Sequence, residues 1–153
     1  MKKLQRFIAL ALTVAILGVT LCSCSNVGKS IMEDTYSQYE NVASSASFIT
    51  QDGKTKGSFS LKGKKEEVKQ ITVDMGKEVE YNTVVLGEST KTVTLYEIYG
   101  SNEQDANYKF LYQSDCIEGG HTCYLGDVNY RYLRIFVNGS SGRYNVNSFS
   151  AYN

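Results

Sequence analysis

The feature that most constrains the fold is a series of short apolar runs between turn-forming residues, which extends from Asn41 to Asn153. No stretch of helical periodicity is long enough to place helices between these runs. The pattern therefore predicts an all-β domain, an antiparallel β-sandwich or barrel. The candidate strands are 56–63, 68–75, 82–88, 92–100, 108–114, 122–126, 131–139 and 147–153.

Alternation within the runs indicates which side chains enter the core. Ile71, Val73 and Met75 share one face of their run, and Leu133, Ile135 and Val137 share one face of another. The composition agrees, because 12 Tyr, 13 Gly and an absence of Pro and Trp suit short strands and tight turns.

The first residues have the pattern of an export signal. Lys2, Lys3 and Arg6 precede the uncharged stretch 7–21. A membrane span needs about 20 apolar residues, so this stretch is short for one. An uncleaved anchor helix is the alternative. The sequence LCSCSN that follows resembles a bacterial lipobox, which implies that Cys24 becomes a lipidated N-terminus.

These features divide the chain into three parts. Residues 1–23 are predicted to be a lipoprotein signal peptide, 24–40 a tether and 41–153 the β-sandwich. We expect the protein to be exported and lipid-anchored on the outer side of a bacterial membrane.

The charge composition argues against a nucleic-acid partner. The 16 basic and 16 acidic residues cancel, and no basic stripe with interleaved aromatic residues is present. The run KGKKEEVK at 62–69 is interpreted as a solvated loop.

Motifs for nucleophilic or zinc catalysis are missing, so no enzymatic activity is expected. Hydrolysis by a pair of carboxylates from distant strands is the alternative, which spacing alone does not test. A nucleophilic triad would have to use His121, the only histidine, and the GSSG at 139–142 has the wrong spacing for a nucleophile elbow. Cys116 and Cys123 with one histidine form no paired zinc motif. We expect no cofactor.

Five motifs in order resemble the discoidin, or coagulation-factor type C, module. They are ITVDMGKEVEYNTVVL, LYEIYGSN, YKFLYQSD, RYLRIF and NSFSAYN, and the resemblance covers about 41–153. The nearest variety is the module appended to bacterial fucosidases and other glycoside hydrolases. The resemblance implies a jelly-roll sandwich of the galactose-binding-domain type and a carbohydrate-binding role.

The chain departs from this family's pattern in three places. Phe59 stands where the family usually has Trp, and it can still pack in the core. Ser148 replaces a Glu that helps to hold a structural calcium ion, which leaves Asp52 as a weak calcium candidate. Glu88 stands where the galactose-binding pattern has Arg, so galactose specificity is not inferred.

The strand order predicts where a ligand site would lie. In an antiparallel run alternate loops share one end, which groups 88–92, 117–121 and 138–146, while 76–82, 100–107 and 127–131 lie at the other end. In the resembled modules the first of these ends holds the ligand. The candidate ligand-binding residues are Glu88, Lys91, His121, Arg143 and Tyr144. The alternatives are a turn role for His121, a bracing role for Arg143 and Tyr144, and simple surface charges for Glu88 and Lys91.

Cys116 and Cys123 are candidates for a disulfide. If Gly119 and Gly120 form a two-residue hairpin turn, the two cysteines face each other at a distance suited to a disulfide. The alternative is that both are small buried hydrophobic residues.

We therefore expect a non-catalytic surface lipoprotein that binds a glycan or cell-envelope polysaccharide through loops at one end of the sandwich. The alternative is a structural or protein-binding envelope module without glycan affinity.

Overall fold

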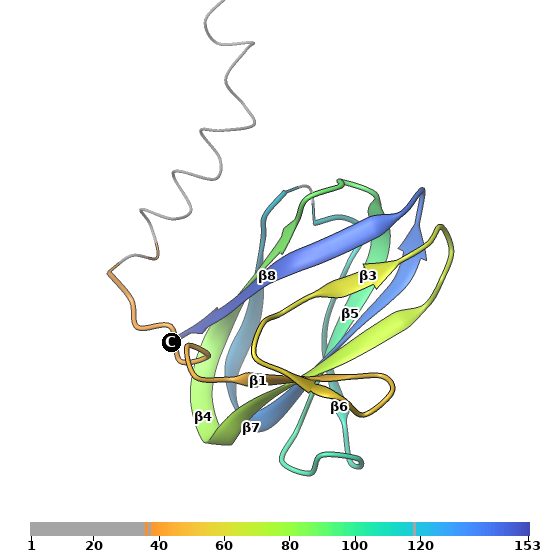
Figure 1. The fold of residues 1–153 in the computed structure, drawn as a ribbon. Helices are drawn as coiled ribbons and strands as arrows, with labels where there is room; N and C mark the ends of the chain where they lie inside the picture. The colour runs from red at the N-terminus through yellow and green to blue at the C-terminus, as the bar shows by residue number, and fades with distance from the viewer. Residues whose placement is uncertain (1–35, 37, 118) are drawn as a thin grey trace, which may run out of the picture. The chain divides into compact units, whose positions relative to one another are not determined.

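A computed structural model describes residue 36, residues 38–117 and residues 119–153, and within them the chain is almost entirely β (Figure 1). The signal peptide and the lipidation site at Cys24 lie outside the described residues, as does most of the tether. The strands are β1 (Ser47–Thr50), β2 (Thr55–Lys56), β3 (Leu61–Gly63), β4 (Lys69–Glu88), β5 (Val93–Ser101), β6 (Lys109–Ser114), β7 (His121–Ser140) and β8 (Tyr144–Tyr152).

Two long strands, β4 and β7, belong to both layers of a sandwich. In one layer, ordered β2-β1-β4-β7-β5-β6, the first part of β4 pairs with the last part of β7, with Ile71 opposite Ile135. The second half of β4 also pairs with β8, which in turn pairs with β3. All of these pairings are antiparallel. The predicted antiparallel β-sandwich is confirmed.

The core contains the side chains that alternation predicts. Ile71 and Val73 are fully buried and Met75 is 5% exposed, while Leu133, Ile135 and Val137 are fully buried. Phe59 is also buried, and its ring stacks on Phe149 at 5.6 Å between centroids and meets Phe48 edge-on at 5.5 Å. Phe therefore fills the core position where the resembled family usually has Trp.

Two predicted turns, 76–82 and 127–131, are instead parts of continuous strands. Val79 pairs with Tyr130 across β4 and β7, after a register shift that follows Asp74. Gly76 and Gly126 have φ angles of 81° and 72°, values that glycine adopts without strain, and they let each strand bend from one layer to the other. Glycine here marks bends rather than ends of strands.

The start of the domain is fastened to its last strand. The N–H of Val42 donates to the carbonyl oxygen of Ala151 at 2.9 Å, and the N–H of Ala151 donates to Oδ1 of Asn41 at 3.1 Å. Tyr36, in the predicted tether, stacks on Tyr152 at 4.8 Å. In the part of the chain that the structure describes, no helix has the length and apolar character to cross a membrane.

Candidate functional site

Three loops predicted to share one end of the sandwich do lie together. The N–H of Ser141 donates to the carbonyl oxygen of Thr92 at 2.8 Å, and the N–H of Ser89 donates to that of Asn145 at 3.1 Å. A Cβ atom placed on Gly119 would lie 3.8 Å from Cε of Lys91. The loops 88–92, 116–121 and 140–144 therefore meet at one surface.

A fourth loop, 64–67, joins them. The Ser140 hydroxyl accepts a hydrogen bond from the N–H of Glu66 at 3.1 Å and lies 3.3 Å from the carbonyl oxygen of Lys64. The Tyr144 hydroxyl donates to the carbonyl oxygen of Glu67 at 2.7 Å. We call the surface formed by 64–67, 88–92, 116–117, 119–121 and 140–144 the loop end.

Glu88 is a buried carboxylate that shapes the loop following β4. Its side chain is 3% exposed, and Oε1 accepts hydrogen bonds from the N–H of Thr92 at 2.8 Å and from the hydroxyl of Thr90. The N–H of Val93 lies 3.2 Å from Oε2. The Thr92 hydroxyl, 3.0 Å from Oε1, also lies 2.8 Å from the carbonyl oxygen of Arg143. Glu88 thus fixes the loop 88–92 directly, and the Thr92 hydroxyl connects this loop to the loop that carries Arg143.

Tyr144 is also buried, with 2% of its surface exposed. Burial, with the Glu67 carboxylate as a second cause, raises the pKa of Tyr144 to about 12. Its ring lies against Gly63, where an added Cβ would come within 2.2 Å of the ring. A ring in this position is not available to stack on a sugar, so Tyr144 braces the loop end, as the alternative interpretation proposed.

His121 is half-buried, and both of its ring nitrogens are in hydrogen bonds within the domain. Nδ1 lies 2.8 Å from the carbonyl oxygen of Cys116, and Nε2 lies 3.1 Å from the Tyr112 hydroxyl. The ring also meets Tyr96 edge-on at 5.9 Å. These contacts fix the start of β7.

Lys91 and Arg143 are the two predicted site residues whose side chains are exposed. Lys91 has a φ angle of 55°, in the left-handed region that non-glycine residues rarely adopt, so the loop holds it in an uncommon conformation. The backbone of Arg143 is held through its carbonyl oxygen by Thr92. Among the predicted site residues, the loop end therefore presents these two cations on a hydrogen-bonded frame, and Lys64 and Lys65 of the loop 64–67 are exposed beside them.

The hairpin that underlay the predicted disulfide is not formed. Strand β6 pairs with β5, whereas the start of β7 pairs with β4, where Cys123 lies opposite Val84. Cys123 is a buried thiol in the structure. Burial raises the pKa of Cys123 to about 11, and its Sγ lies 3.0 Å from the Tyr96 hydroxyl. For Cys123 the alternative of a small buried residue describes the structure.

The surroundings of Asp52 do not fit a calcium site. Its carboxylate forms an ion pair with Nζ of Lys54 at 2.7 Å and accepts a hydrogen bond from the Thr50 hydroxyl. Lys54 is the main cause that lowers the pKa of Asp52 to about 2. Calcium requires about six to eight oxygen ligands. Among the described residues no group of three His, Cys, Asp or Glu side chains is placed to hold a metal.

The sequence analysis missed a pocket on the side of the sandwich. It has a volume of about 500 Å³ and lies among the β1–β2 turn, β3 and the start of β4. We call it the lateral pocket. Its lining is Thr50, Gln51, Asp52, Lys56, Ser60, Leu61, Lys62, Lys69, Gln70 and Ile71. The signal in the sequence is the density of lysines between 54 and 69, of which only the run 62–69 is interpreted above, as a solvated loop.

Solved structures with the same fold come from carbohydrate-active proteins. A GH29 fucosidase of Ruminococcus gnavus, solved with fucose, is 15% identical with a TM-score of 0.62 over 74% of this chain and 26% of that chain. Chitosan-binding module 1 from a chitosanase/glucanase of Paenibacillus sp. IK-5 is 15% identical with a TM-score of 0.62, over 75% of this chain and 100% of the module. The module CpGH89CBM32-6 of Clostridium perfringens is 17% identical with a TM-score of 0.58, over 74% and 99%.

These likenesses establish the fold, and this chain spans about a quarter of the fucosidase. No curated protein matches the sequence. The family model for the F5/8 type C domain matches residues 32–151, most of the chain. The five sequence motifs, the sandwich and this match agree, and the chain belongs to the F5/8 type C domain family.

Proposed function

We propose that this protein is a non-catalytic carbohydrate-binding module that binds glycan through the loop end. The observation that carries the proposal is the arrangement of Lys91 and Arg143, two exposed cations on loops joined by buried hydrogen bonds. Ammonium and guanidinium groups donate directed hydrogen bonds to sugar hydroxyls and to acidic substituents. Holding the loops in advance reduces the entropy lost on binding.

The proposed roles of the five predicted residues differ. Lys91 and Arg143 contact the glycan. Glu88 and Tyr144 hold the loops that carry these cations, through the hydrogen bonds to Thr92 and Glu67, while His121 holds the neighbouring loop through Cys116.

Membership of the F5/8 type C family and the likeness to a chitosan-binding module support a carbohydrate ligand. The fucosidase, solved with fucose, carries the same fold within a longer enzyme. The loop end has no exposed aromatic ring among its described residues, so hydrogen bonds rather than ring stacking would dominate binding.

A second candidate is a module that binds another protein, which an aromatic patch on the outer layer supports. Phe110 is 57% exposed, and Tyr99 lies edge-on between Phe110 at 5.7 Å and Phe136 at 5.6 Å. Aromatic residues are enriched at protein interfaces. This patch faces away from the core on strands β5, β6 and β7.

A glycan array probed with the full chain separates the two candidates. Signals that a free monosaccharide competes away support the carbohydrate-binding module. Silence on all glycans, with a protein partner whose binding is lost in Phe110→Ser, supports the second candidate and contradicts the first.

We also propose that the protein is exported and anchored by lipid at Cys24, on the basis of the lipobox-like LCSCSN. Metabolic labelling with a fatty-acid analogue should mark the wild type and Cys22→Ala but not Cys24→Ala. Labelling that survives Cys24→Ala contradicts this assignment.

A further inference from the structure

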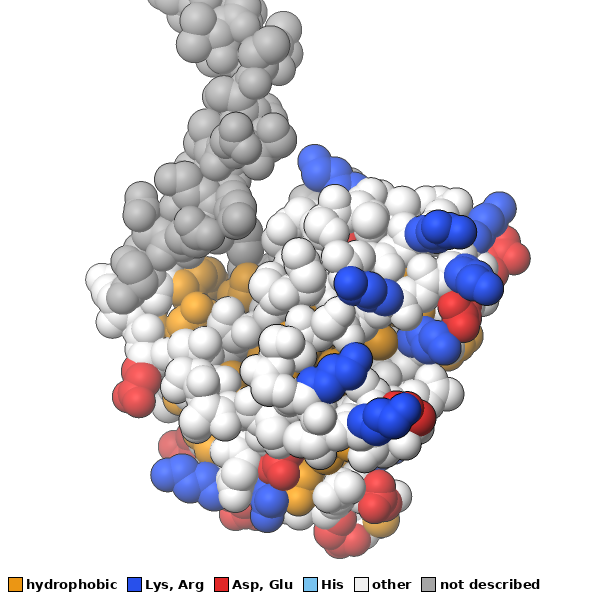
Figure 2. Space-filling model, viewed as in Figure 1, with side chains coloured by type: hydrophobic (Ala, Val, Ile, Leu, Met, Phe, Trp, Pro, Cys, Tyr) orange, Lys and Arg blue, Asp and Glu red, His pale blue; other side chains and the backbone are white. Residues whose placement is uncertain are grey.

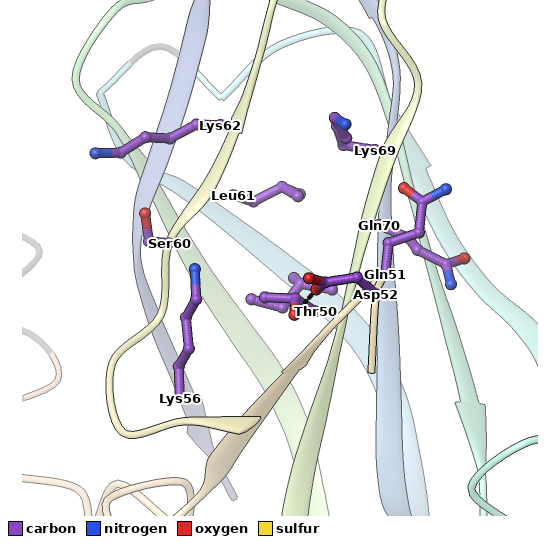
Figure 3. A pocket seen from close by; sticks show the side chains of 10 residues that line it. Thr50, Gln51, Asp52, Lys56, Ser60, Leu61, Lys62, Lys69 and Gln70 are labelled. Atoms are coloured by element: carbon purple, nitrogen blue, oxygen red, sulfur yellow. Dashed lines mark hydrogen bonds between the residues drawn. The ribbon is translucent and has the colours of Figure 1, made fainter. Parts of the chain in front are cut away.

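The lateral pocket has the form of a site for one or two sugar units. Its volume is about 500 Å³, within the range of small-ligand pockets. In Figure 3, Lys56, Ser60 and Lys62 lie on one side and Lys69 and Gln70 on the other, with Thr50 and Asp52 between them. Leu61, which is 4% exposed, and Ile71, which is fully buried, supply apolar lining. Amide, hydroxyl and ammonium groups thus surround an apolar base.

The positive charges around the pocket exceed the negative ones. Asp52 is neutralised by Lys54, and Lys69 forms an ion pair with Glu67 at 3.0 Å. Lys56 and Lys62 are exposed, and no carboxylate in the described part of the chain lies within ion-pairing distance of either. These two ammonium groups are available to an anionic ligand.

Charge is also segregated along the chain. Between 50 and 70 there are six lysines and three carboxylates. After residue 35 the sequence has 12 basic and 14 acidic residues, so the remainder carries six basic against 11 acidic residues. Figure 2 shows Lys and Arg side chains gathered on the face that carries β3. A basic surface on a domain that is otherwise acidic raises the local concentration of anions at that surface.

We propose that the lateral pocket is a second binding site, which takes the anionic group of an acidic polysaccharide, with Lys56 and Lys62 as its main charged contacts. The amides of Gln51 and Gln70 and the hydroxyl of Ser60 supply hydrogen bonds to the sugar that bears the group. The lining contains no aromatic ring on which a nucleic-acid base could stack, which favours a sugar polymer.

The pocket is distinct from the loop end, and this inference does not depend on glycan binding there. The loop 64–67 belongs to the loop end and borders the pocket. Its backbone is fastened to Ser140 and Tyr144, while the Glu67 side chain pairs with Lys69 in the pocket lining. Substitution of the exposed Lys56 and Lys62 removes none of these contacts.

The test is calorimetric titration of the full chain with a uronic acid hexasaccharide and with a neutral hexasaccharide of the same linkage. We expect the acidic oligomer to bind at least about tenfold more tightly, and added salt to weaken binding of the acidic oligomer alone. Equal affinity for both oligomers would overturn the proposal, as would an absence of binding to any anionic sugar.

Charge-matched variants locate the site. The double variant Lys56→Gln and Lys62→Gln should lower affinity for the acidic oligomer about fivefold or more, because two desolvated contacts are lost. The control double variant Lys77→Gln and Lys109→Gln removes the same charge outside the pocket and should stay within about twofold. If both double variants lost affinity for the acidic oligomer equally, the effect would come from net charge alone, and this would contradict a binding site in the lateral pocket. All four lysines are on the surface or half-exposed, and equal melting temperatures verify folding.

Further arms identify the anion and the partner class. A sulfated hexasaccharide or inorganic phosphate that displaces the acidic oligomer from the wild type, but not from the Lys56 and Lys62 variant, supports the site. The relative strength of this competition ranks carboxylate, sulfate and phosphate as ligands of the pocket. A single-stranded oligonucleotide that binds more tightly than every acidic sugar would contradict the assigned partner. In the background of Lys91→Ala with Arg143→Ala, the change of Lys56 and Lys62 to Gln should still lower affinity for the acidic oligomer about fivefold, so that failure here and failure of the loop-end proposal are distinguishable.

Discussion

The loop end and the opposite end of the sandwich are both rich in polar residues, but they are ordered in different ways. At the loop end, buried side chains such as Glu88 and Tyr144 hold separate loops together. At the opposite end the long strands β4 and β7 continue through the bend, and Asp74 pairs with Arg131 across them at 2.8 Å. The polar segment 100–107 bonds within itself, as from the Ser101 hydroxyl to the carbonyl oxygen of Ala106 at 2.7 Å, and also to β7, where the N–H of Arg131 donates to Oδ1 of Asn102 at 2.8 Å.

The difference indicates how each end can be used. Loops held by buried partners can present exposed cations in fixed positions, which binding requires. The opposite end, built from continuous strands, also gains stability from backbone pairing across the bend. The comparison predicts that deletions of buried side chains at the loop end cost more stability than deletions of the exposed or half-exposed side chains at the opposite end.

The largest loss of stability is expected for Tyr144→Ala, about 3–5 kcal/mol in the free energy of unfolding, because a large buried aromatic ring is removed. Tyr144→Phe removes the hydroxyl bond to Glu67 and should cost only about 1 kcal/mol. Urea unfolding measures both. A loss below about 0.5 kcal/mol for Tyr144→Ala would mean that the ring is exposed and available to a ligand, as its prediction as a ligand-binding residue requires.

A smaller loss is expected for Glu88→Ala, about 2–3 kcal/mol, because the N–H groups of Thr92 and Val93 lose a charged acceptor in a buried place. The matched control is Glu80→Ala, which removes an exposed carboxylate and should change stability by no more than about 0.5 kcal/mol. An equal loss of unfolding free energy in Glu88→Ala and Glu80→Ala would contradict the difference proposed between the loop end and the opposite end.

A still smaller effect, with a defined pH dependence, is expected for Asp74→Asn. The Arg131 guanidinium holds the pKa of Asp74 below its usual range, so the stabilisation is present at neutral pH and is lost as pH falls below about 4. The pair is partly exposed, so we expect a loss of about 1 kcal/mol or less at pH 7. Denaturant midpoints from pH 7 to pH 3 should converge for wild type and variant, and a constant gap would contradict this account.

The sequence predicted the core because burial follows the alternation of Ile71, Val73 and Met75 and of Leu133, Ile135 and Val137. It misplaced strand ends at Gly76 and Gly126, because a glycine that bends a strand has the same local pattern as one that ends it. The grouping of loops at one end also followed from strand order. The chain reverses direction at each bend as it would at a turn, so mistaking a bend for a strand end does not change which loops lie together.

The roles of individual site residues were harder to predict. Tyr144 was interpreted as a loop residue, although its spacing from the buried Val146 is that of a strand whose first residue faces inward. The lateral pocket depends on contacts between β1, β3 and β4 that no local pattern encodes. The Cys116–Cys123 hairpin failed because β6 and β7 pair with different neighbours.

The most direct test of the central claim is the affinity of the loop-end double variant Lys91→Ala and Arg143→Ala for the glycan with the strongest array signal. Both side chains are exposed, so the melting temperature should not change. We predict an affinity loss of about tenfold, equivalent to about 1.4 kcal/mol, with Lys77→Ala and Lys109→Ala as the charge-matched control that stays within about twofold. Wild-type affinity in the folded loop-end variant would contradict glycan binding at the loop end.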